Sequence, residues 1–160
     1  MSSANAQLLQ ARERIQTLAK RFHQEVSSDP LWTVAKQKGL IDIPQTNGWE
    51  DRPLFTQIIT IHTRDKYTWW LYYQLLSSAF CVYPVHHPVV PVGRSRIRVT
   101  LHAANTEEQI EKLVHTVFHW VQEVMDIEEG RVAEKAPGAA TTVYAWMKKE
   151  GLSGFGFVQT

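Results

Sequence analysis

One continuous segment, residues 87–113 (HPVVPVGRSRIRVTLHAANTEEQIEKL), constrains the fold more than the rest of the chain does. It begins with prolines that restrict the backbone and turns at Gly93, after which residues 94–101 have the alternation of a strand. The arginines of this strand, at positions 94, 96 and 98, fall on one face and the apolar residues on the other. Thr106 followed by Gln109 predicts a capping box that starts a helix. A strand with arginines on one face, beside a capped amphipathic helix, favours an anion-binding site.

Hydrophobic periodicity predicts the elements around this segment. Helices are expected at residues 4–26, 65–77 and 106–125, with shorter ones around 31–38 and 142–149, and strands at 55–62, 79–83 and 94–101. Asp65 is expected to cap the second long helix, and Pro84 to end strand pairing after Tyr83. This order predicts an α+β fold, with a small antiparallel or mixed sheet of about three strands covered by helices on one face.

Length and composition set the class of protein. A chain of 160 residues with 44% hydrophobic content suits one globular domain, and a net charge of +1 gives no reason to expect a nucleic acid or an anionic membrane as partner. The single cysteine, Cys81, lies in an apolar run and is expected to be buried. No apolar run approaches the ~20 residues of a membrane span, and the first residues lack the pattern of a secretory signal. We therefore expect a soluble, cytoplasmic protein.

The run VPVGRSRIRVTLHAANTEEQIEKL resembles the C-terminal small domain of the pyridoxal-phosphate-dependent α-oxoamine synthases. That family includes 8-amino-7-oxononanoate synthase and glycine C-acetyltransferase, and it has the turn glycine, the arginine spacing and the capped helix in this order. The resemblance extends more loosely to a strand–helix–strand unit near residues 53–85 and a leading helix at 6–26. It implies a small domain of the fold-type-I kind over residues 1–128, followed by a C-terminal extension at 129–160 that is partly helical or disordered.

Arg98 is the one site residue that the resemblance assigns. It is the second arginine of the Arg-Ile-Arg element, which in the family holds the carboxylate of the amino-acid substrate. A planar guanidinium matches a carboxylate with two parallel hydrogen bonds, which lysine does not imitate. The pattern alone indicates a solvated strand edge, and Arg94 and Arg96 keep that interpretation. Where the family usually has a histidine before the capping threonine, this chain has Asn105, and His102 lies earlier.

The cofactor of the family is held by its large domain, through a lysine, an aspartate, a histidine and a glycine-rich phosphate loop. No lysine here has the sequence context of the cofactor lysine; Lys36, in TVAKQKG, comes nearest but follows the first helix. The resemblance thus implies pyridoxal phosphate in the complete enzyme, whereas no catalytic, cofactor-binding or metal-binding residue is assigned in this chain. Because the cofactor carries the chemistry, we expect the chain to be inactive by itself and to need a large-domain or dimer partner.

The resemblance favours the small-domain portion of an acyltransferase that condenses an amino acid with an acyl thioester and then decarboxylates the product. Within the same resemblance, the parent enzyme is alternatively a class I/II aminotransferase. An alternative of another class is a non-catalytic partner subunit or relic that docks on a complete synthase. The dense aromatic residues of the segment 69–73 are expected to build core and a protein contact surface, because basic residues do not interleave with them.

Two groups of histidines are interpreted as polar surface. His115, His119 and Glu123 follow one another at four-residue spacing, but the metalloprotease pattern needs a glutamate directly after the first histidine, and Thr116 stands there. A solvated helix face without a metal is therefore expected. The histidine pair at 86–87 is expected in a polar loop, near where the family's substrate-facing loop lies.

Overall fold

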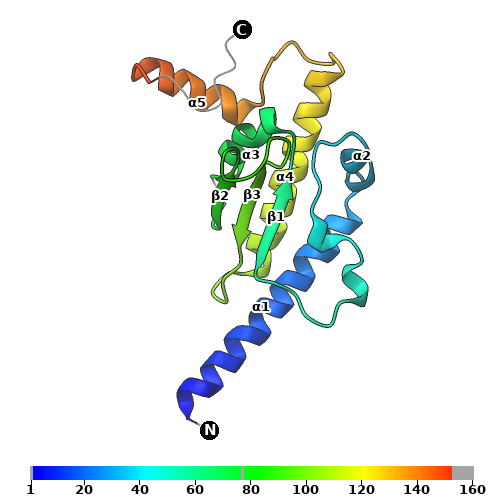
Figure 1. The fold of residues 1–160 in the computed structure, drawn as a ribbon, viewed down its shortest axis with the longest axis vertical. Helices are drawn as coiled ribbons and strands as arrows, with labels where there is room; N and C mark the ends of the chain where they lie inside the picture. The colour runs from blue at the N-terminus through cyan, green and yellow to red at the C-terminus, as the bar shows by residue number, and fades with distance from the viewer. Residues whose placement is uncertain (1, 77, 153–160) are drawn as a thin grey trace.

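The computed structural model describes residues 2–76 and 78–152, and it shows an antiparallel sheet of three strands with helices packed on one face (Figure 1). The predicted α+β fold is confirmed. The long elements, in chain order, are α1 (Ser3–Ser28), β1 (Ile58–His62), α3 (Thr68–Leu75), β2 (Cys81–Val85), β3 (Arg96–Thr100), α4 (Glu107–Glu128) and α5 (Gly138–Lys149). A short helix, α2 (Trp32–Gln37), and 3-10 turns at Pro44–Thr46, Trp49–Asp51 and Asp65–Tyr67 complete the described part.

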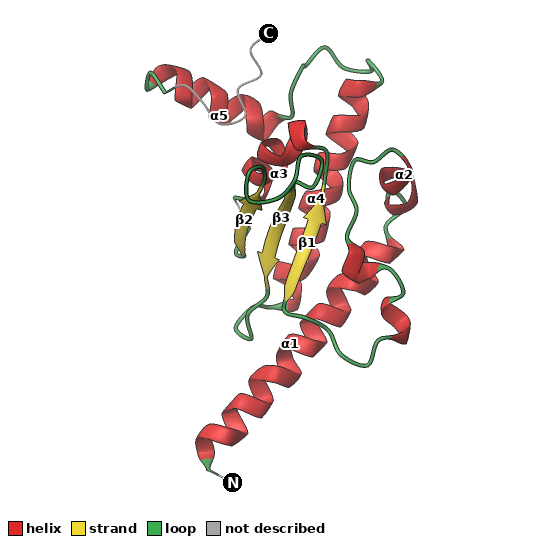
Figure 2. Ribbon diagram, in the orientation of Figure 1, coloured by secondary structure: helices red, strands yellow, loops and turns green. Residues whose placement is uncertain are grey.

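The sheet has the order β1-β3-β2, so the arginine-bearing strand β3 lies in the centre (Figure 2). Ile97 and Val99 of β3 are fully buried, as are Ile59 and Ile61 of β1, because alternate side chains point to the helical layer. Burying a side chain of this size contributes about 1.5–3 kcal/mol to stability. The face that carries the arginines is therefore the one turned away from the core, as the sequence predicts.

The helical layer packs α4 against both α1 and α3, and in the view of Figure 1 α4 passes behind the sheet. Trp120 of α4 and Phe22 and Leu18 of α1 are fully buried between these elements. α5 packs on α3, where the Trp70 indole N–H donates to the Tyr144 hydroxyl at 2.7 Å. The helix predicted around 142–149 is α5, which begins earlier than predicted, at Gly138. The division of the chain at residue 128 stays a prediction, and the glycine-rich end at 153–160 lies outside the described residues.

The turn from β3 into α4 is rigid because its polar groups are paired. The Thr106 hydroxyl accepts from the Gln109 amide at 3.2 Å, and the Gln109 side chain accepts from the Thr106 amide at 3.0 Å, which confirms the predicted capping box. Asn105 adds to it: its side-chain oxygen accepts from the His102 amide at 2.7 Å. Asn105, the residue before the capping threonine, thus helps to hold the turn.

Three local predictions are wrong. Strand β2 continues through Pro84 to Val85, since an edge strand loses no ladder bond when the missing N–H faces its free side. Asp65 does not cap α3, which begins at Thr68 after a 3-10 turn; the Asp65 carboxylate instead accepts from two amides of the turn before β3. Cys81 is exposed, because its side chain points to the face away from the core.

Candidate functional site: the arginine face of the sheet

The face of the sheet opposite the helices carries the arginines, and we call it the open face. Its members follow from the strand register, since residues directly opposite each other point to the same side. They are Ile58, Thr60 and His62 of β1, Arg96, Arg98 and Thr100 of β3, and Cys81, Tyr83 and Val85 of β2. Tyr83 is 65% exposed and Ile58 38% exposed, so large apolar groups on this face remain in contact with solvent in the chain alone.

Arg98 lies at the centre of the open face, on the middle strand, between Thr60 on β1 and Tyr83 on β2. Its side chain is exposed. Within the described residues, 2–76 and 78–152, its guanidinium has no hydrogen bond or ion pair to another side chain or to the backbone. The group is therefore available for a ligand, and a fork of two N–H donors suits a carboxylate.

The other two arginines have different surroundings. Arg96 is half-buried beside His62 and Val85, and its Nε is buried without a hydrogen-bond partner in the described part of the chain. Arg94 is exposed and precedes β3, in the turn, rather than standing on the strand. Of the three arginines predicted to lie on one face of the strand, Arg96 and Arg98 do so, whereas Arg94 lies in the turn before it.

His62 lies at the end of the open face, opposite Arg96 across the two strands. Burial lowers the pKa of this imidazole, and the charges of Arg96 and Arg94 lower it further against the opposite effect of Asp42. The ring is therefore neutral at pH 7. A cavity of about 220 Å³ opens here, lined by Lys36, Asp42, His62, Arg64 and Gly93 among others.

Asp65 is the site residue whose role the sequence did not predict. Its carboxylate accepts from the Gly93 amide at 2.6 Å and from the Ser95 amide at 3.2 Å, and so fixes the turn that leads into β3. Hydrogen bonds from the Ser95 side chain and the Gly93 amide hold the pKa of Asp65 below its usual value. An aspartate just before a predicted helix indicates an N-cap. The sequence pattern therefore singled out Asp65 but did not predict that its carboxylate binds the Gly93 and Ser95 amides.

The open face does not supply the groups that pyridoxal phosphate needs. It contains no lysine for a covalent link and no carboxylate for the pyridine nitrogen, as the register of its nine residues shows. Lys36 lines the cavity near His62 at the end of this face, and its Nζ lies 2.6 Å from the Asn47 side-chain oxygen and 4.9 Å from the Trp32 ring centre. The nine residues of the open face therefore do not fit the cofactor by themselves.

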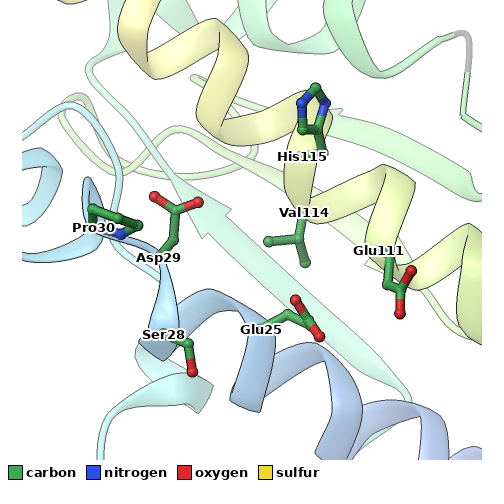
Figure 3. A pocket seen from close by; sticks show the side chains of 7 residues that line it. All are labelled: Glu25, Ser28, Asp29, Pro30, Glu111, Val114 and His115. Atoms are coloured by element: carbon green, nitrogen blue, oxygen red, sulfur yellow. The ribbon is translucent and has the colours of Figure 1, made fainter.

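A second cavity, of about 420 Å³, lies between the end of α1 and α4, on the helical side of the molecule (Figure 3). Three carboxylates line it, together with His115. Two of them, Glu25 and Glu111, form ion pairs with the same partner, Arg21, at 2.9 and 2.5 Å. The acidic lining is thus part of a helix–helix ion-pair network rather than a free binding site.

The histidines of α4 lie on an exposed helix face. The rings of His115 and His119 stack with their centres 6.4 Å apart, and His119 Nε2 lies 3.3 Å from a Glu123 oxygen. Across residues 2–76 and 78–152, no group of three or more histidine, cysteine or acidic side chains is arranged to hold a metal ion. None of the described helices is long and apolar enough to cross a membrane.

The aromatic segment of α3 divides between core and surface. Trp70 is buried and stacks on Tyr67 with ring centres 5.1 Å apart. Trp69 is half-buried, and its ring meets those of Tyr72 at 5.7 Å and His86 at 5.3 Å, both edge-on. His86 is therefore packed against an aromatic ring at the start of the loop that joins β2 to β3.

Comparison with known proteins identifies relatives over most of the chain. The chain is 42% identical over 137 residues to "Aminoacyl transferase sphA" from Byssochlamys spectabilis and, equally, to the protein of that name from Aspergillus fumigatus. These matches cover 86% of this chain but only 29% of each relative. A shorter match, 40% identical over 46 residues, is to "8-amino-7-oxononanoate synthase" from Emericella nidulans and covers 29% of this chain and 11% of that protein.

No model of a protein family matches the chain. The chain spans less than a third of the length of the curated relatives it matches, so most of each relative has no counterpart in these 160 residues. The activity of the whole relatives thus belongs to a polypeptide much longer than the part that is shared.

Proposed function

We propose that the chain acts as the small domain of an enzyme related to the pyridoxal-phosphate-dependent α-oxoamine synthases. Its similarity to part of an aminoacyl transferase and part of an 8-amino-7-oxononanoate synthase supports this role. In this role it takes part in the transfer of an acyl group from a thioester to an amino acid. The cofactor is bound by a lysine-bearing large domain, which is either joined to this chain or supplied by a partner. A cytoplasmic location is part of the same proposal.

The position and exposure of Arg98 are the observation that supports the proposal most directly. Arg98 stands at the centre of the open face with its guanidinium free of protein partners in the described part of the chain. A carboxylate that docks here gains charge-assisted hydrogen bonds, each contributing about 1.5–3 kcal/mol. We assign to Arg98 the carboxylate of the amino-acid substrate. This interaction would orient the carboxylate and keep the amino group directed away from the sheet, toward the large domain.

The open face is the surface on which the large domain would lie. Its exposed apolar groups, Tyr83 and Ile58, surround a polar centre at Arg98 and Thr60. Covering such a face excludes water from the site, which strengthens the arginine–carboxylate interaction. The opposite face offers no equivalent surface, because α1, α3 and α4 already cover it.

A non-catalytic partner that docks on a complete synthase is the second candidate. The absence of a lysine and a carboxylate from the nine residues of the open face favours it, since these residues alone do not hold the cofactor. The two candidates differ in one respect: only the small domain of an active site places Arg98 in contact with substrate.

Reconstitution tests the proposal. The chain and a lysine-bearing large domain from a related synthase are assayed separately and together for release of free thiol from an acyl thioester in the presence of an amino acid. We expect no turnover from the chain alone, and turnover only when both parts are present or fused. Turnover by the large domain that this chain leaves unchanged would favour the non-catalytic partner instead.

A further inference from the structure

The end of the loop between β2 and β3 is held in place by polar contacts. Two of its valines, Val89 and Val92, are 81% and 76% exposed. The loop ends in a turn closed by the Arg94 amide, which donates to the Pro91 carbonyl at 3.1 Å, with Gly93 at a φ of 83° between them. Only a residue without a Cβ adopts that conformation without strain.

The carboxylate of Asp65 spans this turn. One oxygen accepts from the Gly93 amide at 2.6 Å and the other from the Ser95 amide at 3.2 Å. Hydrogen bonds to an ionised acceptor are shorter and stronger than neutral ones. The sheet pairing of β3 starts only at Arg96, so Asp65 provides acceptors for amides just beyond the end of the ladder.

The charge of Asp65 also matters at this end of the sheet. Three arginines lie within five residues, and in the described part of the chain none of them forms an ion pair with a carboxylate. Like charges that lie close together repel one another. Asp65 is bonded to the backbone amides on either side of Arg94 and places a negative charge just before β3 without occupying any of the guanidinium groups.

We propose that Asp65 is a positioning residue for Arg98: by binding the Gly93 and Ser95 amides it fixes where β3 starts, and with it the place of the Arg98 guanidinium. This proposal rests on the proposed function, in which Arg98 binds the substrate carboxylate. Strand register is sensitive at this point, because a slip of one residue moves every side chain to the other face. A substrate site also loses binding when a contact group is displaced by as little as about 1 Å.

The first half of the test uses the 160-residue chain alone and measures amide hydrogen exchange by NMR. In Asp65→Ala we expect exchange at Gly93 and Ser95 to become about tenfold faster, the change that loss of a charge-assisted hydrogen bond implies. Asp65→Asn keeps one acceptor oxygen and should give a smaller increase. Asp51→Ala, at another exposed aspartate, is the matched control. Unchanged exchange at both amides would overturn the proposal.

The second half uses the active assembly of this chain with its large domain and separates KM from kcat. Asp65→Ala should raise KM for the amino acid about five- to tenfold, with a smaller effect on kcat, and Asp65→Glu should restore most of the affinity because it keeps the charge. If Arg98→Lys raises KM but Asp65→Ala does not, Asp65 is structural only and this proposal is wrong while the proposed function stands. If Arg98→Lys leaves KM unchanged, the role of Arg98 fails, and the role of Asp65 fails with it.

Discussion

Residues on the two sides of the sheet differ in their exposure to solvent. Arg98 is charged and exposed on the open face, whereas His23 of α1 is 1% exposed in the core. The His23 Nδ1 lies 2.9 Å from the Thr46 hydroxyl oxygen, and the ring packs against Phe22 and Phe55, each with ring centres 5.4 Å away. His23 thus ties α1 to the segment that leads into β1, and it does so as a neutral ring.

The buried imidazole predicts how stability depends on pH. Burial, and secondarily the charge of Arg52, lower the pKa of His23 from 6.5 to about 4. Between these values the unfolded chain binds a proton that the folded chain does not, so stability falls as the pH drops from above 6.5 toward 4. The loss is at most about 3 kcal/mol.

Urea denaturation at a series of pH values measures this effect. In His23→Gln the free energy of unfolding should decline less between pH 6.5 and 4 than in the native chain. Some decline should remain, because the pKa of His62 is also lowered by folding. Parallel pH profiles for the two proteins would contradict the assignment.

At the scale of elements, the sequence predicted those that depend on local pattern. The hydrophobic periodicity of α4, its capping box and the alternation of β3 are properties of consecutive residues, and each is confirmed. What it did not predict depends on partners far along the chain. Pro84 is tolerated because β2 is an edge strand, and Asp65 is bonded to residues about thirty positions away, which no local pattern contains.

The surroundings of Arg98 in the site could likewise be predicted only in part from the sequence. The alternation of β3 predicted its face, but the strand order that puts it between Thr60 and Tyr83 came only with the structure. Cys81 lies in an apolar run and was predicted to be buried, yet its face is set by the register of β2 against β3. Long-range pairing therefore decides which residues share the open face.

The capping box gives a prediction at the scale of one helix. Thr106→Ala removes the acceptor for the Gln109 amide and should destabilise the fold by about 1 kcal/mol. Thr142→Ala is the control, because Thr142 is an exposed mid-helix residue of α5 whose hydroxyl only bonds back to Gly138. Alanine favours a helix interior, so this control should not lose stability. Equal denaturation midpoints for the two variants would contradict the role given to the cap.

The whole molecule is a sheet with one covered face and one open face. The helices bury one side, and the open side carries Arg98 together with exposed apolar groups such as Tyr83. The relatives are more than three times as long as the shared region, so their remaining length is ample for a domain that covers this face. This arrangement fits the proposal that the chain is one part of a two-part site.

Cys81 reports on whether the open face is covered. Its thiol is exposed, opposite Thr100, and it is the single cysteine of the chain. In the chain alone we expect a maleimide to label it fully without denaturant. In the presence of the large domain the labelling should slow markedly, because the face becomes buried. Equal labelling rates with and without the large domain would show that the two parts do not meet on this face.

The most direct test of the account is the effect of Arg98→Lys on amino-acid affinity in the reconstituted or fused enzyme. Lysine keeps the positive charge but removes the planar fork of donors, so we predict that KM for the amino acid rises about tenfold or more, equivalent to about 1.4 kcal/mol. Arg94→Lys, in the turn before the strand, should leave KM within about twofold, since a surface charge away from a ligand contributes little. If Arg98→Lys and Arg94→Lys have the same small effect, Arg98 does not bind the substrate carboxylate and the central claim is wrong.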